Sequence, residues 1–452
     1  MRSSIRTKAS LNSGHTMGAH HFRGRKLSVL AGLTAAALAL SACGGGDTPS
    51  EGDGSEAPAA EATGEATGAP ARDADADLVI WADNMRAEVI KPFAESFGEE
   101  NGVKVQVQYV TDVRGDFSAA IQSGTGPDIV VGAHDWLGEF VQNGSVSPLN
   151  LGSDLEGQFN PKALEAARYE GQTYAIPYAL ETLALIRNKA LAPEAPATLD
   201  DAIALGESLK AEGKASNVLI TNVSQTGDGY HAYPFLSAYG GGFFEKTADG
   251  DYDPSKVILD SPETVKGAEI MASLGEKGIL SVNIGGENAE ALFTKGDVPY
   301  YMAGPWVIPG TRNAGIDYEI TPMPATADGG QLRPFYTVQM AYVSAKAKNP
   351  ALAEEFVLNT IASKDVQVAL FNAGQRVPAL TAAVDDVAKD NPEIKVWNEA
   401  VAGADLMPNI PGMNAVWTAV GQSTADIVAG KISAADGMAA AQKSAVAGLG
   451  TK

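Results

Sequence analysis

The chain alternates between short apolar runs and longer segments in which apolar residues recur every three or four positions. The run LVIW at 78–81 predicts a strand buried on both faces, and VKVQVQYV at 103–110 alternates as a strand with one buried face does. Between them, Ile90, Phe93 and Phe97 share one face of a predicted helix. A short helix (FSAAIQSG) and another buried strand (PDIVVGA) follow. This order predicts a mostly parallel sheet covered by helices.

Two later segments, 199–213 and 261–278, have the period of amphipathic helices. The chain has 452 residues, of which 45% are hydrophobic, and this length predicts two or three compact units. We therefore expect an α/β protein with two lobes.

The stretch AGPWVIPG at 303–310 holds Trp306 between two prolines and two glycines. Proline fixes φ, and glycine lets the chain turn sharply. The stretch predicts a stiff, irregular loop that exposes an indole ring.

Acidic residues outnumber basic ones by 55 to 33, which gives a net charge of −22. Phosphate binding needs a basic surface, so the charge argues against nucleic acid as a partner.

The N-terminal 42 residues contain six basic residues and no acidic one, and they end in the apolar run 27–42. That run is short for a membrane span and typical of a secretion signal. It leads to Cys43, the only cysteine, in the pattern LSAC, which resembles a bacterial lipoprotein signal. A buried free cysteine and an uncleaved anchor helix are the alternatives. We expect residues 1–42 to be a signal peptide, whether translation starts at Met1 or Met17, and Cys43 to carry the lipid.

Residues 44–77 contain nine acids, one base and no aromatic residue. Such a segment cannot bury enough apolar area to fold. We expect residues 43–77 to be a lipidated cysteine followed by a disordered acidic linker, with the folded part starting at residue 78.

The residue types exclude several kinds of site. The only cysteine is expected to carry a lipid, so no cysteine remains for a metal site. The two histidines after the signal, His134 and His231, stand in no zinc-binding or catalytic-triad motif. The sequence also contains no Walker loop for a nucleotide phosphate. What remains is a set of aromatic residues near carboxylates such as Asp135 and Glu181. The apolar face of a sugar packs on an indole, and its hydroxyls donate to carboxylates, so this composition favours a sugar site. A tryptophan is nevertheless more often a core residue.

Five segments resemble the solute-binding proteins of bacterial ABC sugar importers, in particular the maltose/maltodextrin-binding proteins. They are LVIWADN, GPDIVVGAHD, YAIPYALETLALIRNK, ALFTKGDVPYYMAGPW and MPNIPGMNAVW, in that family's order. The resemblance implies a periplasmic-binding-protein-like α/β fold, with two lobes joined by a hinge and a ligand cleft between them. It implies an N-terminal lobe of 78–180 and 341–387 and a C-terminal lobe of 181–340 and 388–452.

The same resemblance implies a set of ligand-binding residues. The aromatic platforms are Trp306, Trp417 and Tyr230. The acceptors of sugar hydroxyls are Asp135, Glu181 and Asp228. Asp83 and Arg86 are further polar contacts, and Met407 forms an apolar wall.

The chain departs from that family's pattern at several positions. Gly132 stands where the family has a tryptophan, Trp136 where it has an arginine, and Thr418 and Gly421 where it has a tyrosine and an arginine. We expect Trp136 to be a new platform, and His231, in place of an apolar aromatic, to be a ligand contact. The sugar is therefore a maltodextrin or related α-glucoside, or a different di- or oligosaccharide.

The resemblance implies that a monomer captures an oligosaccharide and delivers it to ABC transporter permease subunits. It implies no catalytic residue, cofactor or metal, and a location at the extracellular face of the cytoplasmic membrane, held only by the lipid anchor. A second functional class to consider is an extracellular glycoside hydrolase. Such an enzyme would need two carboxylates roughly 5–10 Å apart, and Asp135, Glu181 and Asp228 are the candidates. No hydrolase motif is present. A receptor that presents sugar to a sensor protein also fits the sequence.

Overall fold

The computed structural model describes residues 70–247 and 252–450. The expected signal peptide, Cys43 and linker residues up to 69 lie outside the described residues. Residues 70–77, also expected in the linker, contact the folded part: Arg72 pairs with the buried Asp128 at 2.8 Å, and Ala76 is fully buried. The prediction that the folded part begins at residue 78 is wrong for these residues, because Arg72 finds a buried anionic partner.

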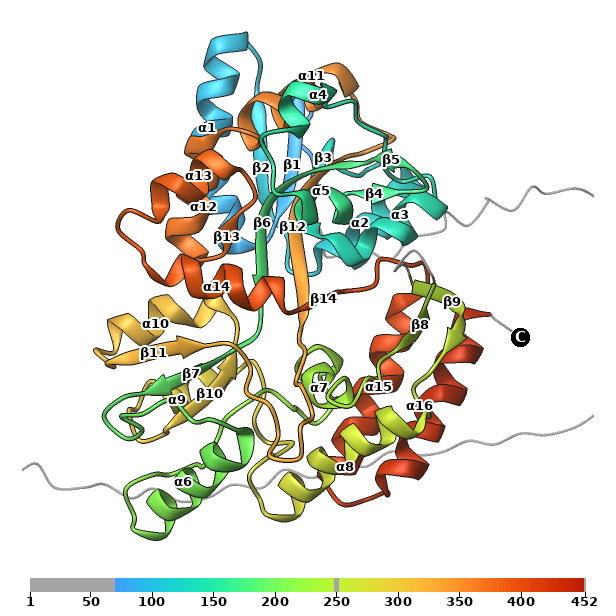
Figure 1. Cartoon of the computed structure of the whole chain (residues 1–452). Coiled ribbons are helices and arrows are strands. Elements are labelled where there is room, and N and C mark those ends of the chain that lie inside the picture. Colours follow the sequence, from blue (N-terminus) through green and yellow to red (C-terminus); the bar gives the residue numbers. More distant parts are fainter. Residues whose placement is uncertain (1–69, 248–251, 451–452) are drawn as a thin grey trace, which may run out of the picture. The chain divides into compact units, whose positions relative to one another are not determined.

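The larger of two main sheets has seven strands, in the order β13-β6-β12-β3-β1-β2, with β14 paired to the start of β12 (Figure 1). They are β1 (Leu78–Ala82), β2 (Val105–Tyr109), β3 (Ile129–Ala133), β6 (Ala175–Thr182), β12 (Phe335–Val343), β13 (Val377–Pro378) and β14 (Asp405–Leu406). β1 is parallel to β2 and β3, as predicted, but β12 is antiparallel to β3 and to β6. The sheet is therefore mixed and not mostly parallel, because β6 leads the chain away from this sheet and β12 brings it back.

The second sheet has three strands in the order β10-β7-β11. They are β7 (Ala184–Asn188), β10 (Tyr300–Ala303) and β11 (Tyr318–Thr321). Only Leu183 separates β6 from β7, so one nearly continuous extended segment joins the two sheets. Leu185 and Met302 pack into one apolar core and Ile186 and Tyr301 into another, so both faces of the small sheet are buried. This explains the apolar runs ALI in β7 and YYMA in β10.

Helices cover both sides of the larger sheet. In Figure 1, α1 and α12 lie on one side and α2 and α3 on the other. The elements around this sheet are α1 (Asn84–Asn101), α2 (Val113–Ser123), α3 (Leu137–Gln142), α4 (Gly152–Glu156), α5 (Pro161–Ala166), the hairpin β4 (Arg168–Tyr169) and β5 (Gln172–Thr173), α11 (Pro350–Glu355), a π-helical turn (Phe356–Ile361), α12 (Lys364–Gly374), α13 (Thr381–Val387) and α14 (Glu393–Ala402). Ile90 and Phe97 of α1 are buried, which confirms the apolar face predicted for this helix.

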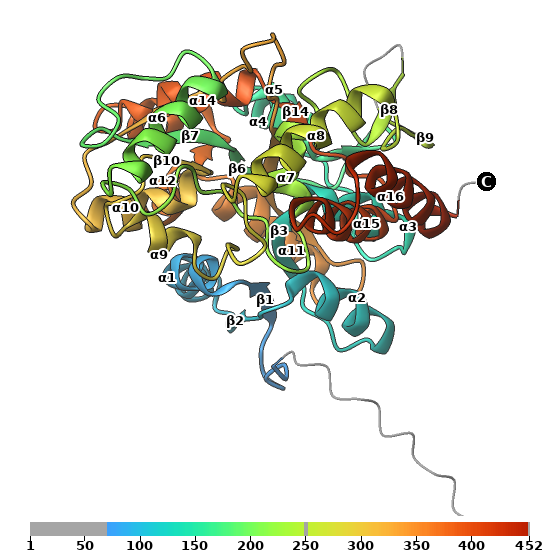
Figure 2. The same cartoon turned by 90° about the horizontal axis from the view of Figure 1, so that it is seen from below.

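A second helical layer packs beyond the small sheet, where α15 contacts α16, α8 and α7 (Figure 2). The remaining elements are α6 (Leu199–Ala211), α7 (Gly229–Leu236), the hairpin β8 (Phe244–Lys246) and β9 (Tyr252–Val257), α8 (Pro262–Glu276), α9 (Ala289–Phe293), α10 (Ile308–Asn313), α15 (Met413–Val428) and α16 (Ala434–Leu449). The helices α6 and α8 confirm the two later amphipathic predictions.

Candidate functional site

Two tryptophans of the expected site occupy the same local structure, a short turn directly after a strand. β3 leads into a 3-10 turn at His134–Trp136, and β10 into one at Pro305–Val307. A Cβ atom on Gly132 would come within 1.8 Å of the Trp136 ring, and one on Gly304 within 1.9 Å of the Trp306 ring. Only glycine lets each ring lie so close to the backbone. The predicted irregular loop at Trp306 is therefore wrong: the segment is a regular turn, and the ring is half-buried.

Trp306 lies among side chains from two other parts of the chain. Its ring centroid is 6.4 Å from that of Tyr230 and 6.3 Å from that of His231, both on α7. The guanidinium carbon of Arg376, between α12 and β13, is 5.7 Å from the Trp306 centroid. The structure thus brings together three expected residues and one that the sequence did not single out.

Both carboxylate oxygens of Glu181, near the end of β6, are engaged. Gln339 donates its amide N–H to Oε1 at 2.6 Å, and Arg376 donates its Nε–H to Oε2. The register of β13 on β6 aligns Val377 with Leu180, which brings Arg376 next to Glu181. Glu181 is only 6% exposed, and burying a carboxyl group is costly unless its oxygens are paired in this way.

The N-terminus of α7 carries three of the expected contacts. Asp228 caps the helix by accepting from the His231 backbone N–H at 3.0 Å, and it contacts Nδ1 of the same histidine at 2.7 Å. Burial alone would raise the pKa of the Asp228 carboxyl, but the bonds to His231 and the backbone outweigh burial and lower that pKa. The Tyr230 hydroxyl is buried; Thr337 lies near enough to influence its pKa, but no hydrogen bond of good geometry reaches this hydroxyl from the described residues.

Asp135, in the turn after β3, contacts Trp417 of α15. Burial raises the pKa of its carboxyl, whereas the Arg114 guanidinium, at 3.4 Å, and the side-chain N–H of Trp417 act in the opposite direction. Arg114 is also paired with Glu139 at 2.7 Å. Asp135 and Trp417, far apart in the sequence, are therefore direct neighbours.

His134 is fully buried and bridges three segments. The Val338 backbone N–H donates to Nδ1 at 3.1 Å, so Nδ1 carries no proton. The neutral ring then donates its Nε2–H to the Met407 carbonyl at 2.8 Å. Burial lowers the pKa of His134.

We expect the His134 ring of the folded protein to stay neutral when the pH falls to about 6.5, where an ordinary histidine is half protonated, because burial lowers its folded pKa. Near that pH the unfolded chain binds a proton that the folded chain does not, so the histidine contributes stability above about pH 6.5 that is lost as the pH falls. Nitrogen-15 NMR of the ring checks this. The signals of a neutral Nε2–H tautomer should persist, and protonation near pH 6.5 would contradict the assignment.

Asp83 and Arg86 form an ion pair at the start of α1, and Arg86 also donates its Nε–H to the Tyr178 hydroxyl. Both residues line a pocket of about 240 Å³ together with Trp136 and Gln339. The structure therefore places three expected residues around one cavity. Gln339, which lines the same cavity, donates to the buried Glu181 carboxylate on β6.

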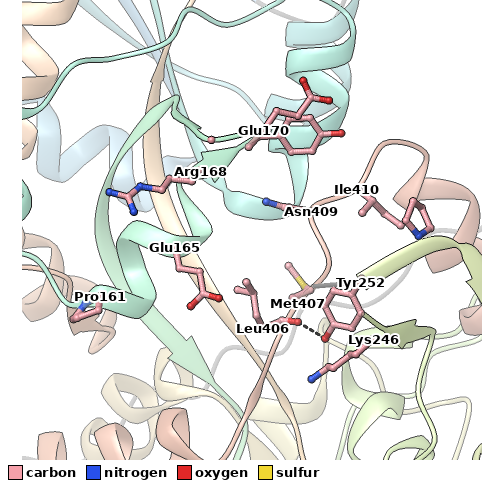
Figure 3. A pocket seen from close by; sticks show the side chains of 13 residues that line it. Pro161, Glu165, Arg168, Glu170, Lys246, Tyr252, Leu406, Met407, Asn409 and Ile410 are labelled. Carbon is pink, nitrogen blue, oxygen red and sulfur yellow. Dashed lines mark hydrogen bonds between the residues drawn. The ribbon is translucent and has the colours of Figure 1, made fainter. Parts of the chain in front are cut away.

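Met407 lies in a different environment from the other expected residues. Its sulfur is 3.8 Å from the Thr337 hydroxyl, and it lines a pocket of about 520 Å³ bounded by α5, the two hairpins and residues 406–410 (Figure 3). The charged and aromatic walls of this pocket are Glu165, Arg168, Tyr169, Glu170, Lys246 and Tyr252. No other expected site residue lines it.

The expected residues other than Met407 form a connected set of aromatic rings and ion pairs. Its members are Asp83, Arg86, Asp135, Trp136, Glu181, Asp228, Tyr230, His231, Trp306 and Trp417. The charges of Arg86, Arg376 and Glu181 all act on the Tyr178 hydroxyl, which places the three close together. The sequence reasoning missed four members of this set: Arg114, Tyr178, Gln339 and Arg376. Gln339 had a signal, since it is polar within the apolar run FYTVQMAYV, whereas Arg376 had none.

The profile of the bacterial extracellular solute-binding proteins matches residues 92–396, more than half of the chain. The chain belongs to this family. The resemblance on which the sequence prediction rested is confirmed at this level, and the mixed α/β architecture agrees with it.

Individual relatives of this solute-binding protein are similar over most of their length. The chain is 28% identical over 420 residues to the galactooligosaccharide-binding protein of Bacillus subtilis (strain 168), covering 90% of this chain and 93% of that relative. It is 30% identical over 354 residues to the maltotriose-binding protein of Pyrococcus abyssi (strain GE5 / Orsay), covering 76% and 75%. It is 24% identical over 422 residues to a maltooligosaccharide ABC transporter solute-binding lipoprotein of Streptococcus pneumoniae (strain ATCC BAA-255 / R6), covering 90% and 93%.

The structure gives a physical account of two departures from the maltodextrin pattern in this solute-binding protein. The Trp136 ring lies against Gly132, so an indole covers the position where the pattern has its own tryptophan. A Cβ atom on Gly227 would come within 1.8 Å of the Gly421 carbonyl oxygen. The loop before α7 therefore packs directly onto α15 where the pattern has an arginine.

Within residues 70–247 and 252–450, no group of three or more His, Cys, Asp or Glu side chains is arranged to hold a metal. None of the helices in these ranges has the length and apolar character needed to cross a membrane.

Proposed function

We propose that this solute-binding protein captures an oligosaccharide at the connected set of rings and ion pairs and delivers it to the permease of an ABC transporter. The observation that carries the proposal is that Trp136, Trp306 and Trp417 each lie next to paired arginine and carboxylate groups. Indole rings pack on apolar sugar faces, and the paired charges offer both donors and acceptors to hydroxyls. The relatives are named as binding proteins for galactooligosaccharides, maltotriose and maltooligosaccharides, which supports the same class of ligand.

A two-lobe arrangement accounts for how a bound sugar changes the protein. We assign 78–180 and 341–387 to one lobe and 181–340 and 388–452 to the other, apart from the start of β12, α14 and β14, which belong to or pack on the larger sheet. The direct passage from β6 to β7 supports a crossing near residue 181, and the entry into β12 supports another near residue 335. Contacts made by both lobes to one sugar then favour a closed state, which a permease recognises. We expect the protein to act as a monomer without a cofactor.

Thermal unfolding with a panel of neutral oligosaccharides tests the ligand class. A sugar that binds only the folded protein raises the melting temperature as its concentration exceeds the dissociation constant. We expect maltotriose, a longer maltooligosaccharide or a β-1,4-galactooligosaccharide to do so. No shift with any of them would overturn the proposal.

The carboxylates of the site favour binding over hydrolysis. Glu181 has both oxygens engaged, Asp228 is held by His231, and Asp135 by Arg114. A glycosidase needs one carboxyl free to donate a proton and another to attack or to activate water. We therefore expect no new reducing ends when the protein is incubated with maltooligosaccharides; their appearance would contradict this assignment.

We expect Cys43 to be diacylated and to be the first residue of the mature chain. The motivation is the LSAC pattern after a basic and apolar leader, in a family of extracellular proteins. Mass spectrometry of the native N-terminus checks it. An unmodified Cys43, or a mature chain that starts elsewhere, would remove the lipid anchor from the account.

A further inference from the structure

Arg376 stands where the proposed sugar contacts from different elements meet, although the sequence pattern did not single it out. Its Nε–H donates to Glu181 on β6, and its guanidinium carbon is 5.7 Å from the centroid of the Trp306 ring. The side chain is 14% exposed, so it is largely enclosed by the site but still accessible from it. Tyr230 borders the same indole, since its ring centroid is 6.4 Å from that of Trp306.

Two kinds of polar group at this place have no partner. The two terminal amino groups of Arg376 have no hydrogen-bond acceptor among the residues that the structure describes. The buried Tyr230 hydroxyl likewise makes no hydrogen bond of good geometry with the described residues. Enclosed polar groups in native proteins nearly always have partners, so unpaired groups side by side point to something that binds between them.

Arg376 lies beside the Trp306 ring. Its guanidinium carbon is 5.7 Å from the ring centroid, near the outer limit of a cation–π contact, which is about 6 Å. Glu181 fixes the guanidinium through its Nε–H, and the planar fork then presents two amino groups in a defined direction. A lysine at this position would keep the charge but lose that geometry.

We propose that Arg376 is a specificity-determining residue, whose terminal amino groups donate to hydroxyls of the sugar ring that packs on Trp306. This inference rests on the proposed function and deepens it. Because the groups that read the sugar are donors in a fixed plane, Arg376 selects ligands by the position of one hydroxyl pair. The Tyr230 hydroxyl faces the same sugar.

The test is calorimetry with Arg376→Lys, using maltotriose or β-1,4-galactotriose, whichever the wild-type protein binds more tightly. Loss of charge-assisted hydrogen bonds should weaken binding about 10- to 100-fold, while the melting temperature without sugar stays the same because the charge opposite Glu181 is kept. Arg333→Lys is the matched control: Arg333 also pairs with a largely buried carboxylate, Asp405, at 3.5 Å, outside the proposed site, and its variant should bind normally.

Monodeoxy analogues of the same trisaccharide separate a direct contact from a general effect. The Arg376→Lys penalty should vanish for the analogue that lacks the contacted hydroxyl and persist for the others. Equal affinity of variant and wild type, or an equal loss for every analogue, would overturn the inference, because Arg376 would then only neutralise Glu181. If the wild-type protein binds neither sugar, the proposed function fails first and the inference with it.

Discussion

Trp306→Ala should weaken oligosaccharide binding by about 30- to 1000-fold, which corresponds to about 2–4 kcal/mol. The substitution removes both the apolar area that a sugar ring covers and the oriented contact of its C–H groups with the indole. The turn Pro305–Val307 and the close approach to Gly304 hold the ring before a ligand arrives, so little ordering entropy offsets the contact. Calorimetry with the preferred sugar measures the change.

The same variant should melt near the wild-type temperature without sugar. The Trp306 ring is half-buried and borders Arg376, Tyr230 and His231, which form the proposed site. An early melting temperature combined with normal sugar affinity would show that Trp306 is a core residue and that the platform assignment is wrong.

Trp81→Ala should produce the largest loss of stability, about 3–5 kcal/mol, and leave the affinity of the folded protein for sugar unchanged. Trp81 lies in β1, is 2% exposed, and donates its indole N–H to the Gln108 side chain at 2.6 Å. Alanine would leave a cavity in the core of the larger sheet and a buried amide without its partner. Thermal unfolding should show a decrease of several degrees. An unchanged melting temperature would mean that the sheet relaxes to fill the space.

These two tryptophans show how much of the structure can be predicted from the sequence. Trp81 was predictable as a core residue because it stands in an unbroken apolar run, and the buried strand that this run predicts is present. For Trp306, the prolines and glycines predicted a stiff segment, but not the 3-10 turn that the structure shows. Its half-buried state was not predictable either, because the residues that cover it come from α7 and from the turn before β13.

The pairing of charged groups was the part that the sequence could not show. Arg376 meets Glu181 only because β13 pairs with β6 in one register, and Asp135 meets Trp417 only because α15 packs against the turn after β3. Likewise, Arg72 reads as part of a disordered acidic linker until Asp128 is known to be buried within reach. The motif resemblance predicted the aromatic and acidic residues of the site, but not the arginines that pair with the carboxylates.

The antiparallel direction of β12 was missed for a similar reason. A run of apolar residues predicts a buried strand but carries no information on its direction. The direction follows from the passage of the chain into the small sheet and back, which places β6 and β12 side by side with opposite polarity (Figure 1).

The central claim is that one oligosaccharide binds at the set of rings and ion pairs around Trp306. Titration calorimetry of the protein with maltotriose and β-1,4-galactotriose tests it most directly. The account predicts saturable binding of at least one of these sugars, with one molecule per chain and an affinity that Trp306→Ala lowers. Absence of binding by either sugar, or a sugar affinity that is the same in wild type and Trp306→Ala, would contradict it.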